Sequence, residues 1–127
     1  MKSFILCGGR GTRLDQEGKI RPKAMVKIGT EPIIMHIINN LIDYKINDFV
    51  LCLGYKKEII ENFFLKKFKN HITEIIKKKN HKILKIKKDN KKNTIYLVDT
   101  GKNSGTGGRL KIANQILKNK DDFLMTY

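Results

Sequence analysis

Residues 4–14 read FILCGGRGTRL, and residues 21–23 read RPK. A short apolar run that passes directly into glycines is typical of a buried parallel strand that ends in an anion-binding loop. The three glycines allow the backbone to turn and bring its N–H groups close to phosphate oxygens. Arg13 and Lys23 add cationic side chains that can hold a polyphosphate. The spacing matches neither the Rossmann fingerprint nor a Walker A loop, so it indicates a nucleotide-binding fold of another kind.

Apolar periodicity along the rest of the chain predicts alternating strands and helices. We expect strands at residues 2–7, 49–53 and 123–127, helices at 33–42, 59–68 and 110–117, and shorter strands between 72 and 97 with polar turns at 79–80 and 89–93. Pro32 is expected in the first turn of the first helix, with Thr30 as its cap. Such alternation predicts an α/β fold with a mostly parallel sheet and helices on both faces.

The net charge of +15 admits two interpretations. Between Lys56 and Lys92 there are fourteen lysines against four acids, which could form a surface for nucleic acid or an anionic membrane. Lysine, asparagine and isoleucine are frequent throughout the chain, however, and lysines on solvated faces explain the charge as well. Because arginine is scarce and aromatic residues do not alternate with the lysines, we favour solvated lysines and expect neither a nucleic-acid partner nor a membrane.

The cysteines and the start of the chain suggest the compartment. Cys7 and Cys52 lie in apolar, strand-like runs without metal-ligand spacing, so we expect two buried free thiols. Such thiols suit a reducing environment. The chain leads from its first three residues directly into a strand, and no run is long enough to span a bilayer. We therefore expect a cytoplasmic protein without a signal peptide.

The chain resembles the sugar-1-phosphate nucleotidyltransferase family. Its signature is Leu-Ala-Gly-Gly-x-Gly-Thr-Arg-Leu followed by Pro-Lys, and Cys7 takes the place of the alanine here. The similarity is greatest to the glucose-1-phosphate cytidylyltransferase subgroup. It continues through PKAMVKIG at 22–29, EPIIMHI at 31–37, INDFV at 46–50, GYK at 54–56, LVDTG at 97–101 and TGGRLK at 106–111.

This resemblance implies a Rossmann-like nucleotidyltransferase fold, a GT-A-like three-layer sandwich with a mostly parallel sheet, here truncated. Residues 1–127 are expected to form the amino-terminal, nucleotide-binding part of a single nucleotidyltransferase domain. The implied reaction joins CTP and a sugar 1-phosphate, most simply glucose 1-phosphate, to give a CDP-sugar and pyrophosphate. It proceeds by in-line attack on the alpha phosphate and serves polysaccharide biosynthesis.

The resemblance also implies the site residues. Arg13 and Lys23 are the expected catalytic residues, Arg13 on the leaving pyrophosphate and Lys23 between the alpha phosphate and the sugar phosphate. The expected nucleotide-binding residues are Leu6, Cys7, Gly8, Gly9, Arg10, Gly11, Thr12, Arg13, Ser104, Thr106, Gly107, Gly108 and Arg109. Gly105 departs from the methionine that cytidylyltransferases carry at this point, which weakens the assignment of cytosine.

The resemblance implies Mg²⁺ as a cofactor, with its ligands outside this chain. In the family, a Gly-Asp-Gly segment follows the strand that matches residues 123–127, and its aspartate binds the metal. Because the sequence ends at Tyr127, we expect the isolated chain to be inactive.

Three alternatives remain open at this point. The chain could be a non-catalytic nucleotide-binding module, a related nucleotidyltransferase that uses UTP or dTTP, or, more remotely, a basic nucleic-acid-binding protein. A homo-oligomer is expected for the full-length protein. We expect His36 to serve packing or a subunit contact, and His71 and His81 to be solvated.

Overall fold

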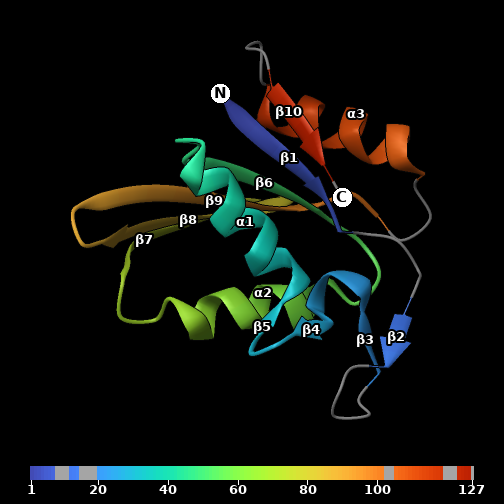
Figure 1. The fold of residues 1–127 in the computed structure, drawn as a ribbon. Helices are drawn as coiled ribbons and strands as arrows, with labels where there is room; N and C mark the ends of the chain where they lie inside the picture. The colour runs from blue at the N-terminus through green and yellow to red at the C-terminus, as the bar shows by residue number, and fades with distance from the viewer. Residues whose placement is uncertain (8–11, 15–19, 102–104, 119–122, 127) are drawn as a thin grey trace.

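A computed structural model describes residues 1–7, 12–14, 20–101, 105–118 and 123–126. At its centre lies a six-stranded sheet with the order β10-β1-β6-β9-β8-β7 (Figure 1). These strands are β1 (Lys2–Leu6), β6 (Asp48–Leu53), β7 (Ile72–Lys77), β8 (His81–Lys88), β9 (Lys91–Asp99) and β10 (Phe123–Thr126). The pairs β10–β1, β1–β6 and β6–β9 are parallel, and β9–β8 and β8–β7 are antiparallel. The prediction of a mostly parallel sheet is confirmed.

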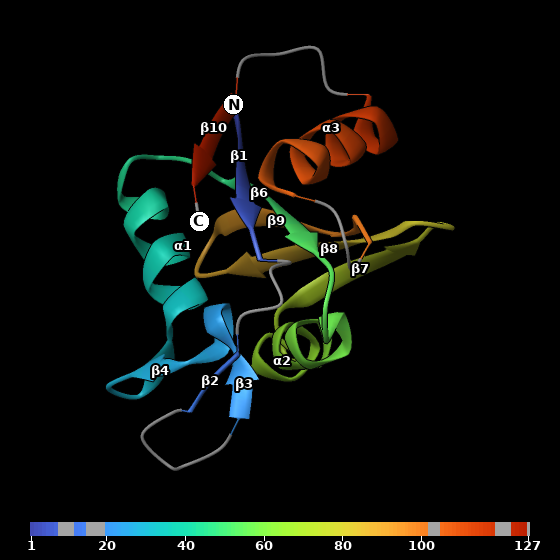
Figure 2. The ribbon, with the colours of Figure 1, turned by 90° about the vertical axis from the view of Figure 1, so that its right-hand side faces the viewer.

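Helices cover both faces of this sheet, also as predicted (Figure 2). α1 (Ile33–Asp43) and α2 (Lys57–Lys67) pack on one face, and α3 (Thr106–Leu117) packs on the other. Side chains of β6 alternate between the two resulting cores, and all residues from Phe49 to Leu53 are buried. A strand with a helical layer on each side has no solvated face, which explains its unbroken apolar sequence.

The start of α1 differs from the prediction. Pro32 is the N-cap with an extended backbone, and no side chain caps the helix. Thr30 lies instead in the turn between two short strands, β4 (Lys27–Ile28) and β5 (Glu31–Pro32). Because strand pairing continues up to Pro32, Thr30 stands too early in the chain to cap the helix, and that prediction is wrong.

Two further boundaries differ from the sequence analysis. α3 begins at Thr106, because the N–H of Arg109 already donates to the carbonyl of Gly105 at 2.9 Å. The helix therefore begins earlier than the expected residue 110. The turn between β8 and β9 is also shorter than expected, since Asp89 and Asn90 alone take positive φ angles of 53° and 64°. That geometry is typical of a two-residue hairpin turn.

A small hairpin precedes these elements along the chain. β2 (Thr12–Leu14) pairs antiparallel with β3 (Ile20–Pro22), and a single 3-10 turn, η1 (Lys23–Met25), follows at once. Met25 in η1 is buried in the core under α1. This contact anchors the segment that carries Lys23 to the body of the domain.

Candidate functional site

The segments singled out from the sequence leave the same edge of the sheet. Leu6, Cys52 and Val98 form one row across β1, β6 and β9, close to the carboxyl end of each strand. The glycine-rich segment follows β1, and the loop to α3 follows β9. In open α/β sheets, ligands bind in the crevice outside the carboxyl ends of the strands. The fold therefore brings the two predicted phosphate-binding segments to one edge.

The first segment is described on both sides of its glycines. Leu6 ends β1, and the N–H of Cys7 donates to the carbonyl of Cys52 at 3.0 Å. Gly8, Gly9, Arg10 and Gly11 lie outside the described residues, and so do the side chains of Thr12 and Arg13. On the backbone, Arg13 lies opposite Arg21 in the β2–β3 hairpin. The row of nucleotide-binding residues predicted here stays a prediction.

Lys23 has a side chain that is free to meet a ligand. It is exposed and begins η1, directly after the buried Pro22. No carboxylate among the described residues forms an ion pair with it. A fixed backbone with a free ammonium group suits a residue that binds an anion.

The two cysteines are buried and free, as predicted. Burial raises the pKa of the Cys7 thiol far above its usual range and raises that of Cys52 to about 12. Nucleophilic chemistry needs the thiolate. Both side chains therefore serve packing.

The second segment is held together by a buried arginine. Arg109 is 4% exposed, and its Nη1 donates to Thr100 Oγ1 at 3.1 Å and to the Gly101 carbonyl at 2.6 Å. Thr100 in turn donates from its N–H and from Oγ1 to the Leu53 carbonyl, each at 2.8 Å. This chain of bonds ties the first turn of α3 to the ends of β9 and β6.

The linking role of Thr100 was not predicted from the sequence, although the glycine that follows it offered a signal. Thr100 stands directly before Gly101, whose φ of 86° marks a sharp change of direction at the end of a buried strand. Arg109 was predicted to contact the nucleotide, which stays a prediction, and its Nη1 donates to Thr100 and Gly101. Ser104 lies outside the described residues, as does the side chain of Thr106.

The first turn of α3 presents backbone donors at this edge. Thr106, Gly107 and Gly108 stand at the start of the helix, where N–H groups have no partner within the helix. A Cβ added at Gly107 would meet no atom within 4 Å among the described residues. The backbone is thus open to close approach by an anion, which helix N-termini attract.

An ion pair closes the other side of the second segment. Lys57 Nζ lies 2.9 Å from Asp99 Oδ2, and the N–H of Gly101 donates to Asp99 Oδ1 at 3.0 Å. The bond from Lys57 holds the pKa of Asp99 below its ordinary value, and the same bond raises the pKa of Lys57. Asp99 therefore acts as a fixed acceptor at the end of β9.

The Asp99→Asn variant is expected to lose less stability in acid than the natural chain. A lowered pKa means that the charge of Asp99 stabilises the fold above its ordinary pKa of about 3.9, and that this contribution is lost as the pH falls through the lowered value. The two side chains of the pair are 38% and 42% exposed, so screening limits the effect to about 0.5 kcal/mol. Urea unfolding at about pH 7 and about pH 3 measures it. Asp43→Asn, at an exposed position, serves as the control, and equal acid losses in both variants would contradict the prediction.

Replacing Arg109 by methionine is expected to destabilise the fold by about 1–3 kcal/mol, because the buried Thr100 hydroxyl and the Gly101 carbonyl lose a charged donor. Lys111→Met is the matched control, since it removes an exposed cation from the same helix. Thermal melting followed by circular dichroism compares the two. Equal melting temperatures would show that the bonds of Arg109 contribute nothing.

The surroundings of two histidines were compared with their predictions. His81 is half-buried at the start of β8, its Nδ1 has no partner, and burial lowers its pKa, so the prediction of a solvated His81 is wrong. His36 is exposed and bonds the Ile28 carbonyl at 2.8 Å, a packing contact. Among residues 1–7, 12–14, 20–101, 105–118 and 123–126, no three His, Cys, Asp or Glu side chains gather as a metal site would require. None of the described helices is long and apolar enough to cross a membrane.

Several known proteins are similar in sequence to this chain, and two of them match it along its whole length. Glucose-1-phosphate cytidylyltransferase from Salmonella typhimurium is 40% identical over 133 aligned residues, which cover 100% of this chain and 49% of that protein. The probable glucose-1-phosphate cytidylyltransferase from Bacillus subtilis is 33% identical over 100% of this chain and 49% of its own length. The UTP–glucose-1-phosphate uridylyltransferase AglF from Haloferax volcanii is 40% identical over 47% of this chain. The chain spans about half the length of the two cytidylyltransferases.

A solved structure and a family profile agree with this result. The crystal structure of HddC from Yersinia pseudotuberculosis complexed with GMP-PN matches 98% of this chain and 46% of its own, with a TM-score of 0.60 and 22% identity. That likeness confirms the predicted Rossmann-like nucleotidyltransferase fold. The profile of the MobA-like NTP transferase domain matches residues 3–76, more than half of the sequence. The chain therefore belongs to the family of MobA-like NTP transferase domains.

Proposed function

We propose that residues 1–127 are the amino-terminal, nucleotide-binding part of a single nucleotidyltransferase domain that transfers a cytidylyl group from CTP to glucose 1-phosphate. The identity of 40% over the whole chain to a glucose-1-phosphate cytidylyltransferase supports the choice of substrates. The observation that carries the proposal is structural. The glycine-rich segment after β1 and the start of α3 leave the same edge of the sheet, on either side of β6.

The reaction needs alignment and charge compensation more than acid–base chemistry. A phosphate oxygen of the sugar phosphate, already anionic near neutral pH, attacks the alpha phosphorus of the triphosphate. A new O–P bond forms as the bond to the beta phosphate breaks and pyrophosphate leaves. Since two polyanions must be held in line, cations and backbone N–H groups are the groups that this chemistry requires.

The two segments divide this work in the proposal. The backbone of Gly8, Gly9 and Gly11 holds the triphosphate, with Thr12 and Arg13 on the outer phosphates and Arg13 stabilising the leaving group. Lys23 lies between the alpha phosphate and the sugar phosphate. The exposed Lys23 ammonium, without an ion-pair partner in the described part of the chain, supports that role.

The start of α3 is proposed to read the base. Gly107 and Gly108 offer backbone donors, and the open space beside Gly107 leaves room for a ring edge. Arg109 is proposed to act through the loop, because its Nη1 is bonded to Thr100 and Gly101. A site with fixed polar groups can reject bases that do not match them.

Magnesium, which the family uses, is not matched by the described residues of this chain. Asp99 is already bonded to Lys57 and to the Gly101 N–H, and no acidic cluster surrounds it. The described residues are therefore given no role as metal ligands in the proposed reaction. Placing its ligands beyond Tyr127 remains part of the proposal.

Comparative binding of CTP, UTP, dTTP and ATP to the chain tests this function. Calorimetry is expected to show tightest binding of CTP, and equal affinity for all four would overturn the choice of base. A pyrophosphate-release assay of the complete protein that carries this chain, with CTP and glucose 1-phosphate, then separates an enzyme from a module that only binds the nucleotide. The uridylyltransferase AglF among the relatives makes UTP the most informative competitor.

We also propose a location and an assembly state for the complete protein. A cytoplasmic location is consistent with two free, buried thiols. A homo-oligomer is the expected assembly of the complete protein. Sedimentation of the complete protein tests this expectation, and a single monomeric species would contradict it.

A further inference from the structure

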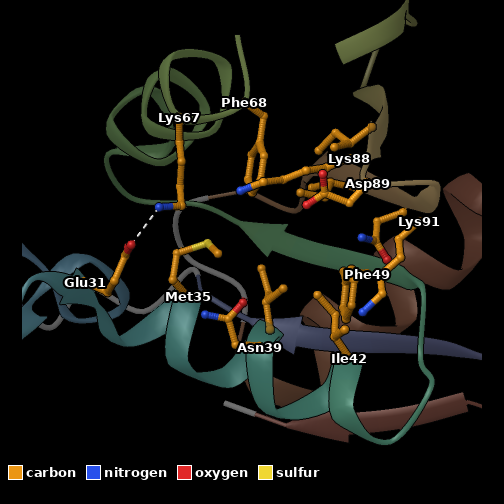
Figure 3. Close-up of a pocket in the computed structure, with 14 residues that line it drawn as sticks. Glu31, Met35, Asn39, Ile42, Phe49, Lys67, Phe68, Lys88, Asp89 and Lys91 are labelled. Atoms are coloured by element: carbon orange, nitrogen blue, oxygen red, sulfur yellow. Dashed lines mark hydrogen bonds and ion pairs between the residues drawn. The ribbon is translucent and has the colours of Figure 1, made fainter. Parts of the chain in front are cut away.

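A cavity of about 350 Å³ lies near the amino ends of the parallel strands, and none of the predicted nucleotide-binding or catalytic residues lines it (Figure 3). Its floor is the sheet, where Phe49, Ile86 and Ile95 line it, and α1 and the end of α2 form its walls. The volume falls within the range of roughly 300–1,000 Å³ that is typical of small-molecule sites. The cavity therefore has the size and the apolar lining of a binding site.

One rim of the cavity carries two lysines beside Asp89. The tight turn of the β8–β9 hairpin places Lys88 and Lys91 directly opposite each other as a cross-strand pair, and both line the cavity. No carboxylate among the described residues forms an ion pair with either of them. Like charges directly opposite in a ladder repel each other. An anion between them would relieve this repulsion.

At the opposite end of the cavity, the positive charge of a lysine is neutralised by an ion pair. Lys67 Nζ forms an ion pair with Glu31 Oε1 at 2.7 Å, and this pair joins the end of α2 to β5 across the edge of the cavity (Figure 3). An anionic ligand is therefore directed to the hairpin end. Asp89 stands at that end as well, so the ligand must also offer hydrogen-bond donors.

A buried hydrogen-bond acceptor on the cavity wall also requires a hydrogen-bond donor from a ligand. Asn93 pairs with Ile86 in the β8–β9 ladder and lines the cavity. Its Oδ1 is buried, and no group in the described part of the chain donates to it. Buried polar atoms are nearly always hydrogen-bonded in native structures, so an unpaired one at a cavity points to a missing donor.

We propose that this cavity binds a small organic phosphate whose ring has an apolar face and carries N–H or O–H donors. The phosphate lies between Lys88 and Lys91, a donor of the ring reaches Asn93 Oδ1, and the apolar face rests on the floor of the sheet. Both a nucleoside monophosphate and a sugar phosphate have this chemistry. The site is separate from the edge where nucleotidyl transfer is proposed and does not depend on that function.

Titration of the chain with uridine 5′-monophosphate, glucose 6-phosphate and inorganic phosphate, followed by NMR of the isoleucine and leucine methyl groups, tests the proposal. Saturable shifts at Ile42, Ile86 and Ile95 with either organic phosphate are expected, and whichever ligand causes them identifies the source. Shifts of equal size with inorganic phosphate would mean an adventitious ion only. Shifts confined to residues at the carboxyl edge, such as Leu6, or no shifts at all would overturn the proposal.

Three variants sharpen the result. Lys88→Ala combined with Lys91→Ala is expected to weaken binding by at least about tenfold, because two charged hydrogen bonds are lost. Lys77→Ala combined with Lys79→Ala removes the same charge from outside the cavity and should leave the affinity unchanged. Asn93→Leu is expected to weaken binding while keeping or raising the melting temperature, since it removes an unpaired acceptor. Unchanged affinity in the first variant or in Asn93→Leu would overturn the proposal.

Discussion

Lys23→Ala is expected to slow nucleotidyl transfer by roughly 100- to 1,000-fold in the protein that carries this chain, the loss typical when one preorganised donor to a transition-state charge is removed. The reason is the place where charge accumulates. In the proposed reaction, Lys23 lies between the alpha phosphate and the attacking phosphate, whose repulsion is greatest when the new bond forms. Measured turnover with saturating CTP and glucose 1-phosphate gives the effect.

The fold should not suffer from this change. The Lys23 side chain is exposed and has no ion-pair partner in the described part of the chain, so the melting temperature is expected to stay the same. Lys66→Ala, which removes an exposed lysine from α2, is the matched control for charge. If the two variants turn over equally fast, Lys23 has no part in the reaction. If Lys23→Ala lowers the melting temperature, its role is structural.

Phe64→Ala is expected to cost about 3–5 kcal/mol of the free energy of unfolding, the range found for large aromatic side chains in packed cores. Phe64 on α2 is fully buried, and its ring lies 5.1 Å from that of Phe63 and 6.2 Å from that of Phe68, centroid to centroid. Since a domain of this size has a total stability of only about 5–15 kcal/mol, the variant should be close to unfolding. Urea unfolding followed by circular dichroism gives the value.

The neighbouring residue provides the control. Phe63 is only partly buried, so Phe63→Ala leaves a smaller cavity and should cost roughly half as much. Similar losses for the two variants would mean that α2 does not dock as described.

The sequence predicted the architecture well because its signals were local and strong. β6 is buried on both faces and reads as an unbroken apolar run, and α1 shows a clear apolar stripe. The predicted start of α1 was wrong because strand pairing, and not the preference of a side chain, determines the backbone conformation there. Thr30 has the chemistry of a cap, yet the pairing of β4 with β5 places it in a turn instead.

The candidate site was predictable in part. Glycines and cations near a strand end predict a phosphate-binding segment, because few other structures need them. Burial of Arg109 could not be foreseen, since its partners Thr100 and Gly101 are brought to it by the tertiary fold. The same holds for the Lys57–Asp99 pair, whose members are 42 positions apart in the sequence.

The order of the strands has a consequence for how the molecule assembles. β7, β8 and β9 follow one another through short turns, whereas β1 meets β10 and β6 only across long stretches of chain. Local hairpins close with little loss of loop entropy, and long-range parallel pairing comes late in folding. The pairing of β10 with β1 spans the longest stretch of chain and is thus expected to form last, so that the strand beside the glycine-rich segment receives its second neighbour in the final step of folding.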